Sequence, residues 1–381
     1  LSLYGDAAYD EFGSRVGAAG DLNGDGYDDF VVGVNLDDAA GTNAGAAYVF
    51  LGSASPDGEP DAVLLGENVE DRFGLSVDGS GDVDGDGHPD LLVGAYNTVG
   101  RVYVFDLVPP LAAQRRELSF TGTANSDQLG FSVSGAGDVD GDGHPDAIAG
   151  APYANVGALS DAGRAYVHLG GTDADEAAEL TLDGAAASDN FGRAVGSAGD
   201  FNGDGYDDVI VGAPGNDAGG GNAGRAYVYY GGATLAATAD LTLTGLAASD
   251  QFGWSVGRAG DVNGDGYDDV VVGAKANSAG GSAAGQAYVF LGGASPDGVA
   301  DWTFTGEAAG DQLGQSVGTA GDVNGDGYDD VIVGAFAADA TWVNAGRAYV
   351  FFGGTTPDAT PDLTVSGEAA DDNLGRAVGT A

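Results

Sequence analysis

Six segments of nine residues carry oxygen-bearing side chains at a fixed spacing. The first reads Asp21-Leu-Asn23-Gly-Asp25-Gly-Tyr27-Asp-Asp29, and the others begin at Asp82, Asp138, Asp200, Asp261 and Asp322. Side-chain oxygens at positions 1, 3, 5 and 9 and the backbone carbonyl at position 7 can converge on one ion. Glycines at positions 4 and 6 allow the positive φ angles that bend the chain around it. Hard oxygen ligands in a flexible loop favour Ca²⁺ over Mg²⁺, which requires stricter octahedral geometry.

The segments therefore predict about six Ca²⁺ ions, one for each complete repeat of the chain. The residues expected to hold them occupy positions 1, 3, 5, 7 and 9 of the six segments. They are Asp21, Asn23, Asp25, Tyr27, Asp29, Asp82, Asp84, Asp86, His88, Asp90, Asp138, Asp140, Asp142, His144, Asp146, Asp200, Asn202, Asp204, Tyr206, Asp208, Asp261, Asn263, Asp265, Tyr267, Asp269, Asp322, Asn324, Asp326, Tyr328 and Asp330.

Other interpretations of the segments are less consistent with the sequence. An EF-hand loop starts similarly, but it closes with Glu at position 12 and lies between helices. An Asx-rich turn without metal remains the alternative, and six copies with the same ligand chemistry argue against it. Zinc is not expected, because His88 and His144 occupy position 7, where the carbonyl binds and the ring points away. Sites 2 and 3 have Asp84 and Asp140 at position 3, and this fourth carboxylate predicts tighter calcium binding.

The charge of the chain is strongly negative, at −47 for 381 residues. Nucleic acid is not an expected partner, because phosphate binding needs clustered Lys and Arg. Adaptation to high salt and cation binding are competing causes of the acidity. Of 50 Asp residues, 24 lie inside the six segments, and only cation binding explains this clustering.

Several classes of protein are excluded by composition. The absence of Cys excludes disulfides and thiolate metal sites. No apolar run approaches the roughly 20 residues of a membrane span. The start without Met is what we expect of a mature or trimmed product.

An internal repeat of about 60 residues organises the whole chain. Each nine-residue segment follows a Phe-Gly or Leu-Gly pair and precedes a β-branched run such as Val270-Val-Val-Gly, which is typical of a strand buried on both faces. An alternating strand and a short fourth strand follow. Helical periodicity is absent except in the stretch after Val108 (Pro-Pro-Leu-Ala-Ala-Gln-Arg-Arg). Four-stranded units repeated radially predict an all-β fold, a β-propeller, whereas the coils of a parallel β-helix are much shorter.

The two ends of the chain bear on the number of blades. Leu1-Ser-Leu-Tyr-Gly resembles a fourth strand, and the segment from Asp372, which contains a seventh Leu-Gly pair, resembles a first strand. We therefore expect residues 1–381 to form one domain with six complete repeats and the outer and inner strands of a seventh, incomplete blade. A six-bladed ring is the alternative.

The repeat resembles the FG-GAP units of integrin α-subunit propellers and of bacterial surface proteins. The resemblance rests on Phe-Gly, the nine-residue segment and Gly-Ala-Pro, which is complete at Gly150-Ala-Pro152 and Gly212-Ala-Pro214. It implies an extracellular or cell-surface module for adhesion or ligand binding, and the Gly/Asp/Ala-rich composition indicates a bacterial source. A structural spacer in a larger surface protein or filament, and a non-catalytic propeller attached to an enzyme, are the alternatives.

Catalysis within this chain is not expected, because two of its three His lie in the nine-residue segments. The third, His168, falls in a third-strand pattern and is interpreted as an edge residue. A protein or carbohydrate ligand is expected on the face opposite the calcium loops, where the connections between the second and third strands vary most. Their large side chains are the candidate contacts, although each of them could instead pack onto a neighbouring blade: Tyr96, Tyr153, Lys275, Phe336 and Trp342.

Overall fold

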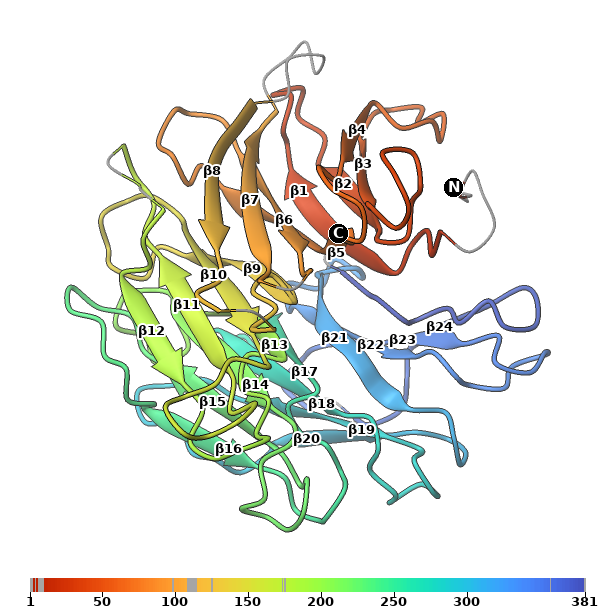
Figure 1. The fold of residues 1–381 in the computed structure, drawn as a ribbon. Helices are drawn as coiled ribbons and strands as arrows, with labels where there is room; N and C mark the ends of the chain where they lie inside the picture. The colour runs from red at the N-terminus through yellow and green to blue at the C-terminus, as the bar shows by residue number, and fades with distance from the viewer. Residues whose placement is uncertain are drawn as a thin grey trace.

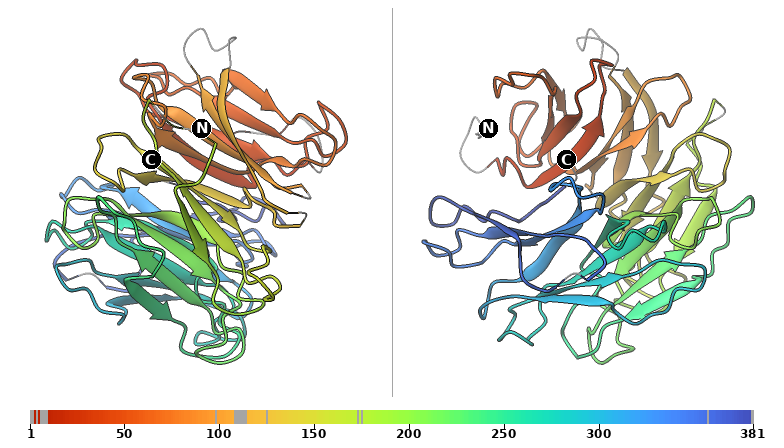
Figure 2. Two further views of the ribbon diagram at one scale, coloured as in Figure 1. Left: turned by 60° about the vertical axis from the view of Figure 1, so that its left-hand side comes forward. Right: turned by 180° about the vertical axis from the view of Figure 1, so that it is seen from behind.

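Each repeat forms one antiparallel sheet of four strands, joined in sequence order without crossovers. The computed structural model describes residues 3, 5, 10–97, 99–107, 115–124, 126–172, 174, 176–356 and 358–379. Six such sheets are arranged around a common axis as the blades of a propeller (Figures 1 and 2). The structure therefore confirms the all-β propeller.

The first three blades contain strands β1 to β12. Blade 1 comprises β1 (Arg15–Gly20), β2 (Asp29–Val34), β3 (Ala46–Phe50) and β4 (Ala62–Leu65). Blade 2 comprises β5 (Phe73–Gly81), β6 (Asp90–Ala95), β7 (Arg101–Asp106) and β8 (Arg115–Thr121). Blade 3 comprises β9 (Ser132–Gly137), β10 (Asp146–Ala151), β11 (Arg164–His168) and β12 (Leu180–Asp183).

The last three blades repeat this plan. Blade 4 comprises β13 (Ala194–Gly199), β14 (Asp208–Ala213), β15 (Arg225–Tyr229) and β16 (Leu241–Thr244). Blade 5 comprises β17 (Ser255–Gly260), β18 (Asp269–Ala274), β19 (Gln286–Phe290) and β20 (Trp302–Thr305). Blade 6 comprises β21 (Leu313–Gly321), β22 (Asp330–Ala335), β23 (Arg347–Phe351) and β24 (Leu363–Ser366).

Burial changes from the axis to the rim of each blade. The first strands surround a central cavity of about 630 Å³. The second strands are buried on both faces, as in β10, β14 and β18, where every residue is buried, and this explains their continuous β-branched runs. The fourth strands lie at the rim, and β24 is exposed along its whole length.

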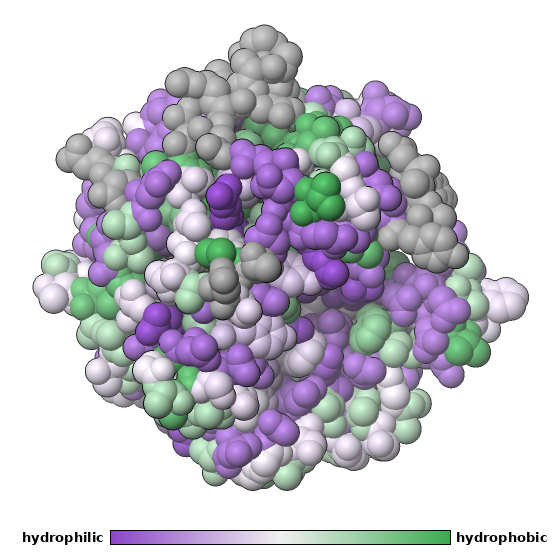
Figure 3. All heavy atoms as spheres, viewed as in Figure 1, coloured by the Kyte–Doolittle hydropathy of each residue, from purple (hydrophilic) through white to green (hydrophobic). Residues whose placement is uncertain are grey.

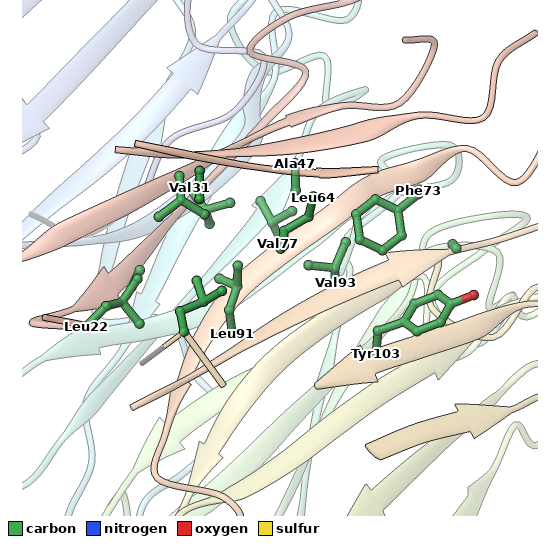
Figure 4. Packing of buried hydrophobic residues seen from close by; sticks show 14 residues of the cluster. Leu22, Val31, Ala47, Leu64, Phe73, Val77, Leu91, Val93 and Tyr103 are labelled. Carbon is green, nitrogen blue, oxygen red and sulfur yellow. The ribbon is translucent and has the colours of Figure 1, made fainter. Parts of the chain in front are cut away.

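The hydrophobic core lies between the blades. At the boundary of blades 1 and 2, Phe73 of the second Phe-Gly pair packs among side chains from both sheets, and its ring lies 5.5 Å from that of Tyr103 (Figure 4). Gly45 of blade 1 also pairs with Phe73 through an isolated bridge. The same bridge recurs at each repeat, so the Phe-Gly pair joins each blade to the one before it.

The predicted seventh blade is not confirmed, and the six-bladed alternative matches the structure. Residues 1–5, the expected outer strand, lie largely outside the described residues. Residues 372–379, the described part of the expected inner strand, contain no strand. They dock beside blade 6 through a hydrogen bond from Ser316 Oγ to Gly375 O (3.0 Å).

The possible helical stretch at 109–116 lies outside the described residues up to position 114, and its last two residues begin β8. No helix among the described residues is long and apolar enough to cross a membrane. Hydrophilic and hydrophobic residues are interspersed on the face seen in Figure 3.

Candidate metal centres and ligand face

The nine-residue segments connect the first and second strand of every blade, as expected. Each follows a glycine with positive φ, where the pairing of the two strands shifts by one residue; in blade 4 this is Gly199 (φ 62°). An irregularity of this kind bends the strand and redirects the chain that follows. The glycine thereby places all six loops at the same end of the propeller.

Side chains and backbone of each loop are folded around one centre, as blade 4 illustrates. The carboxylate of Asp200 accepts hydrogen bonds from Asp204 N (2.9 Å) and Gly205 N (3.0 Å). Asn202 Oδ1 also accepts from Asp204 N (2.8 Å), and Asp204 Oδ1 accepts from Tyr206 N (3.1 Å). Residues at positions 1, 3 and 5 thus direct their oxygens inward in the manner that a hard cation requires.

The aspartate at position 9 also stabilises the loop, by accepting hydrogen bonds from the backbone. Asp208 is fully buried, and its two oxygens accept hydrogen bonds from Phe201 N (3.1 Å) and Gly231 N (2.8 Å). Burial raises the pKa of Asp208 to about 7. Equivalent pairs of bonds are made by Asp29, Asp146, Asp269 and Asp330. Among the described residues, Asp90 makes the bond within its loop, from Val83 N (2.8 Å), but its other oxygen has no partner. In the blades other than blade 2, position 9 therefore connects the loop to the segment between the third and fourth strands.

Sites 2 and 3 bring carboxylates closest together. Oxygens of Asp82, Asp84 and Asp86 lie within 4.8 Å of one another, and a second group of three comprises Asp138, Asp140 and Asp146. Like charges at this separation repel, so a divalent cation with oxygen ligands fits both groups. In the sites with Asn at position 3, the amide instead donates to position 5, as from Asn202 Nδ2 to Asp204 Oδ2 (3.0 Å).

In loops 3 to 6, the ring at position 7 packs against the loop of the preceding blade. A Cβ added to Gly141 of loop 3 would lie 2.5 Å from Tyr206 Cε1, and one added to Gly85 would lie 2.9 Å from His144 Cε1. Loops 2 to 5 are covered in this way, whereas Gly24 and Gly325 of loops 1 and 6 have no atom within 4 Å of that position. The sequence analysis did not predict this contact.

The candidate ligand residues lie after the second strands, on the opposite side of the ring, and the structure brings three of them together. Tyr96 and Tyr153 both make edge contacts with Phe131, at 5.7 and 6.1 Å between ring centroids. Lys275 Nζ lies 3.1 Å from the ring centroid of Trp254.

Phe336 and Trp342 do not join this group through any ring contact within the described residues. Trp342 is 53% exposed.

For Tyr96 the structure matches the packed alternative: it is half-buried, accepts a hydrogen bond from Arg72 Nη1 (2.6 Å) and contacts Phe131 of the next blade. One expectation about an individual side chain needs correction. His168 is not an edge residue: β11 lies between β10 and β12, and its imidazole is buried and stacked on Phe120 at 3.5 Å. The alternation of the third strand, Tyr-Val-His-Leu, places that ring between blades.

Phe131, Arg193 and Trp254 lie on the same face as the candidate ligand residues, and the sequence analysis missed them. Each directly follows a Phe-Gly or Leu-Gly pair and lies at the mouth of the central cavity. The available signal was the variety of residues at this one position in otherwise similar repeats.

Comparison with known proteins agrees with this architecture. The model of the FG-GAP repeat matches residues 12–50, 73–105, 129–168, 191–229, 252–290 and 313–351. The chain belongs to the FG-GAP repeat family. Each match starts at the Phe-Gly or Leu-Gly pair and ends in the third strand, so the repeat of the family coincides with the loop and its three flanking strands.

Two integrin subunits are among the relatives of this FG-GAP chain. It is 33% identical over 235 residues to integrin alpha-5 of Xenopus laevis, covering 58% of this chain and 21% of that protein. It is 32% identical over 212 residues to integrin alpha-PS2 of Drosophila melanogaster, covering 51% of this chain and 15% of that protein.

An enzyme is a further relative. The chain is 30% identical over 285 residues to phosphatidylinositol-glycan-specific phospholipase D of Homo sapiens, covering 65% of this chain and 32% of that protein. The FG-GAP chain thus spans a third or less of the length of these three relatives.

Proposed function

We propose that this chain is a calcium-binding, extracellular propeller that binds a ligand through the face opposite the calcium loops. The observation that carries the proposal is the close grouping of carboxylates at sites 2 and 3, in two of six loops that share the same spacing of oxygen-bearing residues. Similarity to integrin alpha subunits supports an adhesion-type module at the cell surface. The loops are nearly identical, so they offer little basis for selecting a ligand, whereas the opposite face varies.

The metal would be held by the residues at positions 1, 3, 5 and 9, with the carbonyl of position 7. When bound, the cation supplies charge neutralisation within each loop. Asp208 and its equivalents hold the loop in register with the second strand, and Gly24 and Gly26 (φ 72° and 89°) give the bend around the centre. The role of the metal in this proposal is structural, and the ligand contacts lie elsewhere.

A thermal melt in calcium and in excess EDTA tests the proposal. A ligand that binds only the native state stabilises it by about 2.7 kcal/mol per site at a hundredfold excess over Kd, so EDTA is expected to lower the Tm substantially. Excess MgCl₂ serves as the control for general screening. Superimposable curves with and without calcium would refute calcium binding.

Two other functions rest on specific observations. A non-catalytic propeller attached to an enzyme is supported by the similarity to the phospholipase D. In agreement with a non-catalytic role, His168 is buried between blades. A spacer in a surface protein would explain a propeller that binds calcium and no ligand. Full-length protein assayed with and without this region distinguishes these functions, because only an adhesion module loses ligand binding when it is removed.

A further inference from the structure

Positive charge collects at the mouth of the central cavity opposite the calcium loops. Arg15, Arg193 and Arg376 line this cavity near the starts of the first strands, and Lys275 lies over Trp254, which also lines it. Two carboxylates lie nearby: Asp78 lines the cavity, and Glu11 pairs with Arg376 at 3.2 Å. The chain has only 12 Lys and Arg against 59 Asp and Glu, and Lys275 is its single Lys. Four of the 12 basic residues therefore lie at one mouth of the cavity, and such clustering is not expected in a chain this acidic.

Aromatic rings hold two of these cations in place. The guanidinium carbon of Arg193 lies 4.4 Å from the ring centroid of Phe131 and 4.0 Å from that of Trp254. Lys275 Nζ lies 3.1 Å from the Trp254 centroid. Stacking fixes a guanidinium while leaving the N–H groups at its edge free to donate.

No carboxylate neutralises these two side chains. Arg101, Arg164, Arg258, Arg347 and, at the mouth itself, Arg376 each form a salt bridge with Glu or Asp. Within the described ranges, Arg193 and Lys275 form neither a salt bridge nor a side-chain hydrogen bond.

The cations at the mouth also repel one another. Burial, and then Arg15, lower the pKa of Arg193 to about 10, while burial, and then Arg193, lower that of Lys275 to about 7. Partly buried cations without a counter-charge are costly to a folded protein.

We propose that this mouth binds a carboxylate group of an acidic peptide, with Arg193 and Lys275 as the donors. A carboxylate would supply the missing counter-charge and match the planar edge of the guanidinium. Tyr96, Phe131 and Tyr153 line an adjoining cavity of about 380 Å³. Asp161 also lines it, so it can take the backbone or an uncharged part of a neighbouring residue rather than a second carboxylate.

An acidic glycan fits this mouth less well than a peptide. Sugar rings stack on open aromatic faces, but Arg193 and Lys275 already lie over Trp254. The other rings meet Phe131 edge to face, at 68° and 81° between planes, and do not form a flat platform.

This inference deepens the proposed function. It rests on that function in one respect, namely that a macromolecule binds to this face. The anion site itself does not depend on calcium chemistry, so the two can fail separately. Loss of any calcium effect on the Tm with retained peptide binding would refute the calcium role alone.

Calorimetric titration of the calcium-loaded chain with a hexaglutamate peptide tests the proposal. Physiological salt screens the repulsion from the net charge of −47, and excess CaCl₂ prevents competition for the metal. Hexaglutamate is expected to bind, and hexaglutamine is not. Because a hydrogen bond to a charged group contributes about 1.5–3 kcal/mol, Arg193→Gln and Lys275→Gln should each weaken binding about tenfold or more.

Arg164→Gln is the matched control, because it also removes one cation, but one already paired with Asp183 at 2.7 Å. Its affinity for hexaglutamate should stay within about twofold of the parent. The thermal melts of all three variants show whether each is folded. If Arg193→Gln does not fold, Lys275→Gln and the next measurement still decide.

Lys275 provides a direct readout because it is the only Lys. After reductive ¹³C-methylation, its side chain gives one NMR signal apart from that of the terminal amine. Hexaglutamate should raise the pKa of Lys275 from its lowered value, since a carboxylate favours the charged form. An unchanged pKa, equal binding of hexaglutamine, or full affinity in both variants would overturn the proposal. Binding of oligogalacturonate in place of hexaglutamate would overturn the assignment to a peptide.

Discussion

Aspartate has two structural tasks in each repeat, and only one of them was predicted. Beside the loop aspartates, a buried Asp ends each turn between the fourth and first strands. In blade 4 this is Asp189, which accepts hydrogen bonds from Ala186 N (3.0 Å) and from Asn216 Nδ2 (2.9 Å). Part of the acidity of the chain therefore satisfies backbone and side-chain donors, and neither cation binding nor high salt is needed to explain it.

The residue at position 3 of the loop should set calcium affinity. Asp84→Asn and Asp140→Asn are expected to weaken binding at sites 2 and 3, because each removes one of four carboxylates. The reciprocal change Asn202→Asp should strengthen calcium binding at site 4, because it adds a fourth carboxylate. It also removes the hydrogen bond from Asn202 to Asp204 and leaves two like charges, whose repulsion a bound cation would relieve. Calorimetric titration with CaCl₂ measures all three variants. Equal affinities across the set would remove ligand charge as the determinant.

Asp78 should make stability depend on pH. It is a half-buried carboxyl in β5 that lines the central cavity and accepts a hydrogen bond from Ser134 Oγ (2.9 Å), and desolvation raises its pKa to about 6. Its contribution to stability is therefore full below about pH 4 and is lost as the pH rises through 6. Asp78→Asn should increase the free energy of unfolding by about 2 kcal/mol at pH 8 and leave it unchanged at pH 4.

Urea unfolding at the two pH values, in excess calcium, measures this effect. Exposed Asp57→Asn is the control and should have no effect at either pH. A loss of stability at pH 8 in Asp78→Asn would mean that the charge of Asp78 has a partner that the hydrogen bonds do not reveal.

At the scale of the element, local sequence predicted the strands and loops but not how the loops meet. β-branched runs identify the second strands because burial on both faces selects such residues. The contact of Tyr206 with Gly141 joins residues of different repeats. No local pattern encodes it, since periodicity describes one strand at a time and the angle between blades is set by packing.

The contact between neighbouring loops should contribute to stability. Gly141→Ala and Gly143→Ala both place a side chain at positive φ (78° and 94°), which costs about 1 kcal/mol each. Only at Gly141 would the new Cβ also clash with Tyr206, so this variant should lose about 1–3 kcal/mol more. Urea unfolding in excess calcium compares them.

The double variant Gly141→Ala/Tyr206→Ala tests the cause of that difference. Removing the ring should restore most of the extra loss, as a double-mutant cycle measures. Additive losses would show that Tyr206 moves aside at no cost.

At the scale of the whole molecule, calcium should matter more than ionic strength. Six Ca²⁺ would add +12 to the charge of −47 and leave the chain near −35, so some self-repulsion remains. Raising NaCl from about 0.1 M to 1 M shortens the Debye length from about 10 to 3 Å and should raise the Tm modestly. Calcium addition at low salt should raise it more.

Differential scanning calorimetry over this range of NaCl and calcium separates the two causes of acidity. A Tm that follows NaCl and ignores calcium would favour adaptation to high salt.

The repeat architecture could be predicted from the sequence, whereas the number of blades and the distribution of charge could not. Repeats specify a propeller, but blade number depends on how the two ends of the chain meet. The described segment around Leu374 forms no strand: it makes a bridge to Gly346, accepts a hydrogen bond from Ser316, and pairs with Glu11 through Arg376 (3.2 Å). The cationic mouth was missed for a similar reason. Arg15, Arg193, Lys275 and Arg376 are far apart in sequence and converge only because the first strands surround one axis.

The contacts of the position-7 side chains do not run all the way around the propeller, so the series of six loops has a first and a last member. Loops 2 to 5 are each covered by a neighbour, whereas loops 1 and 6, beside the junction of the termini, are not. In a calcium-loaded chain, water and chelators therefore reach the outermost ions first. By access alone, the ions of loops 1 and 6 would be lost before those of loops 2 to 5, and the propeller would loosen first at its seam.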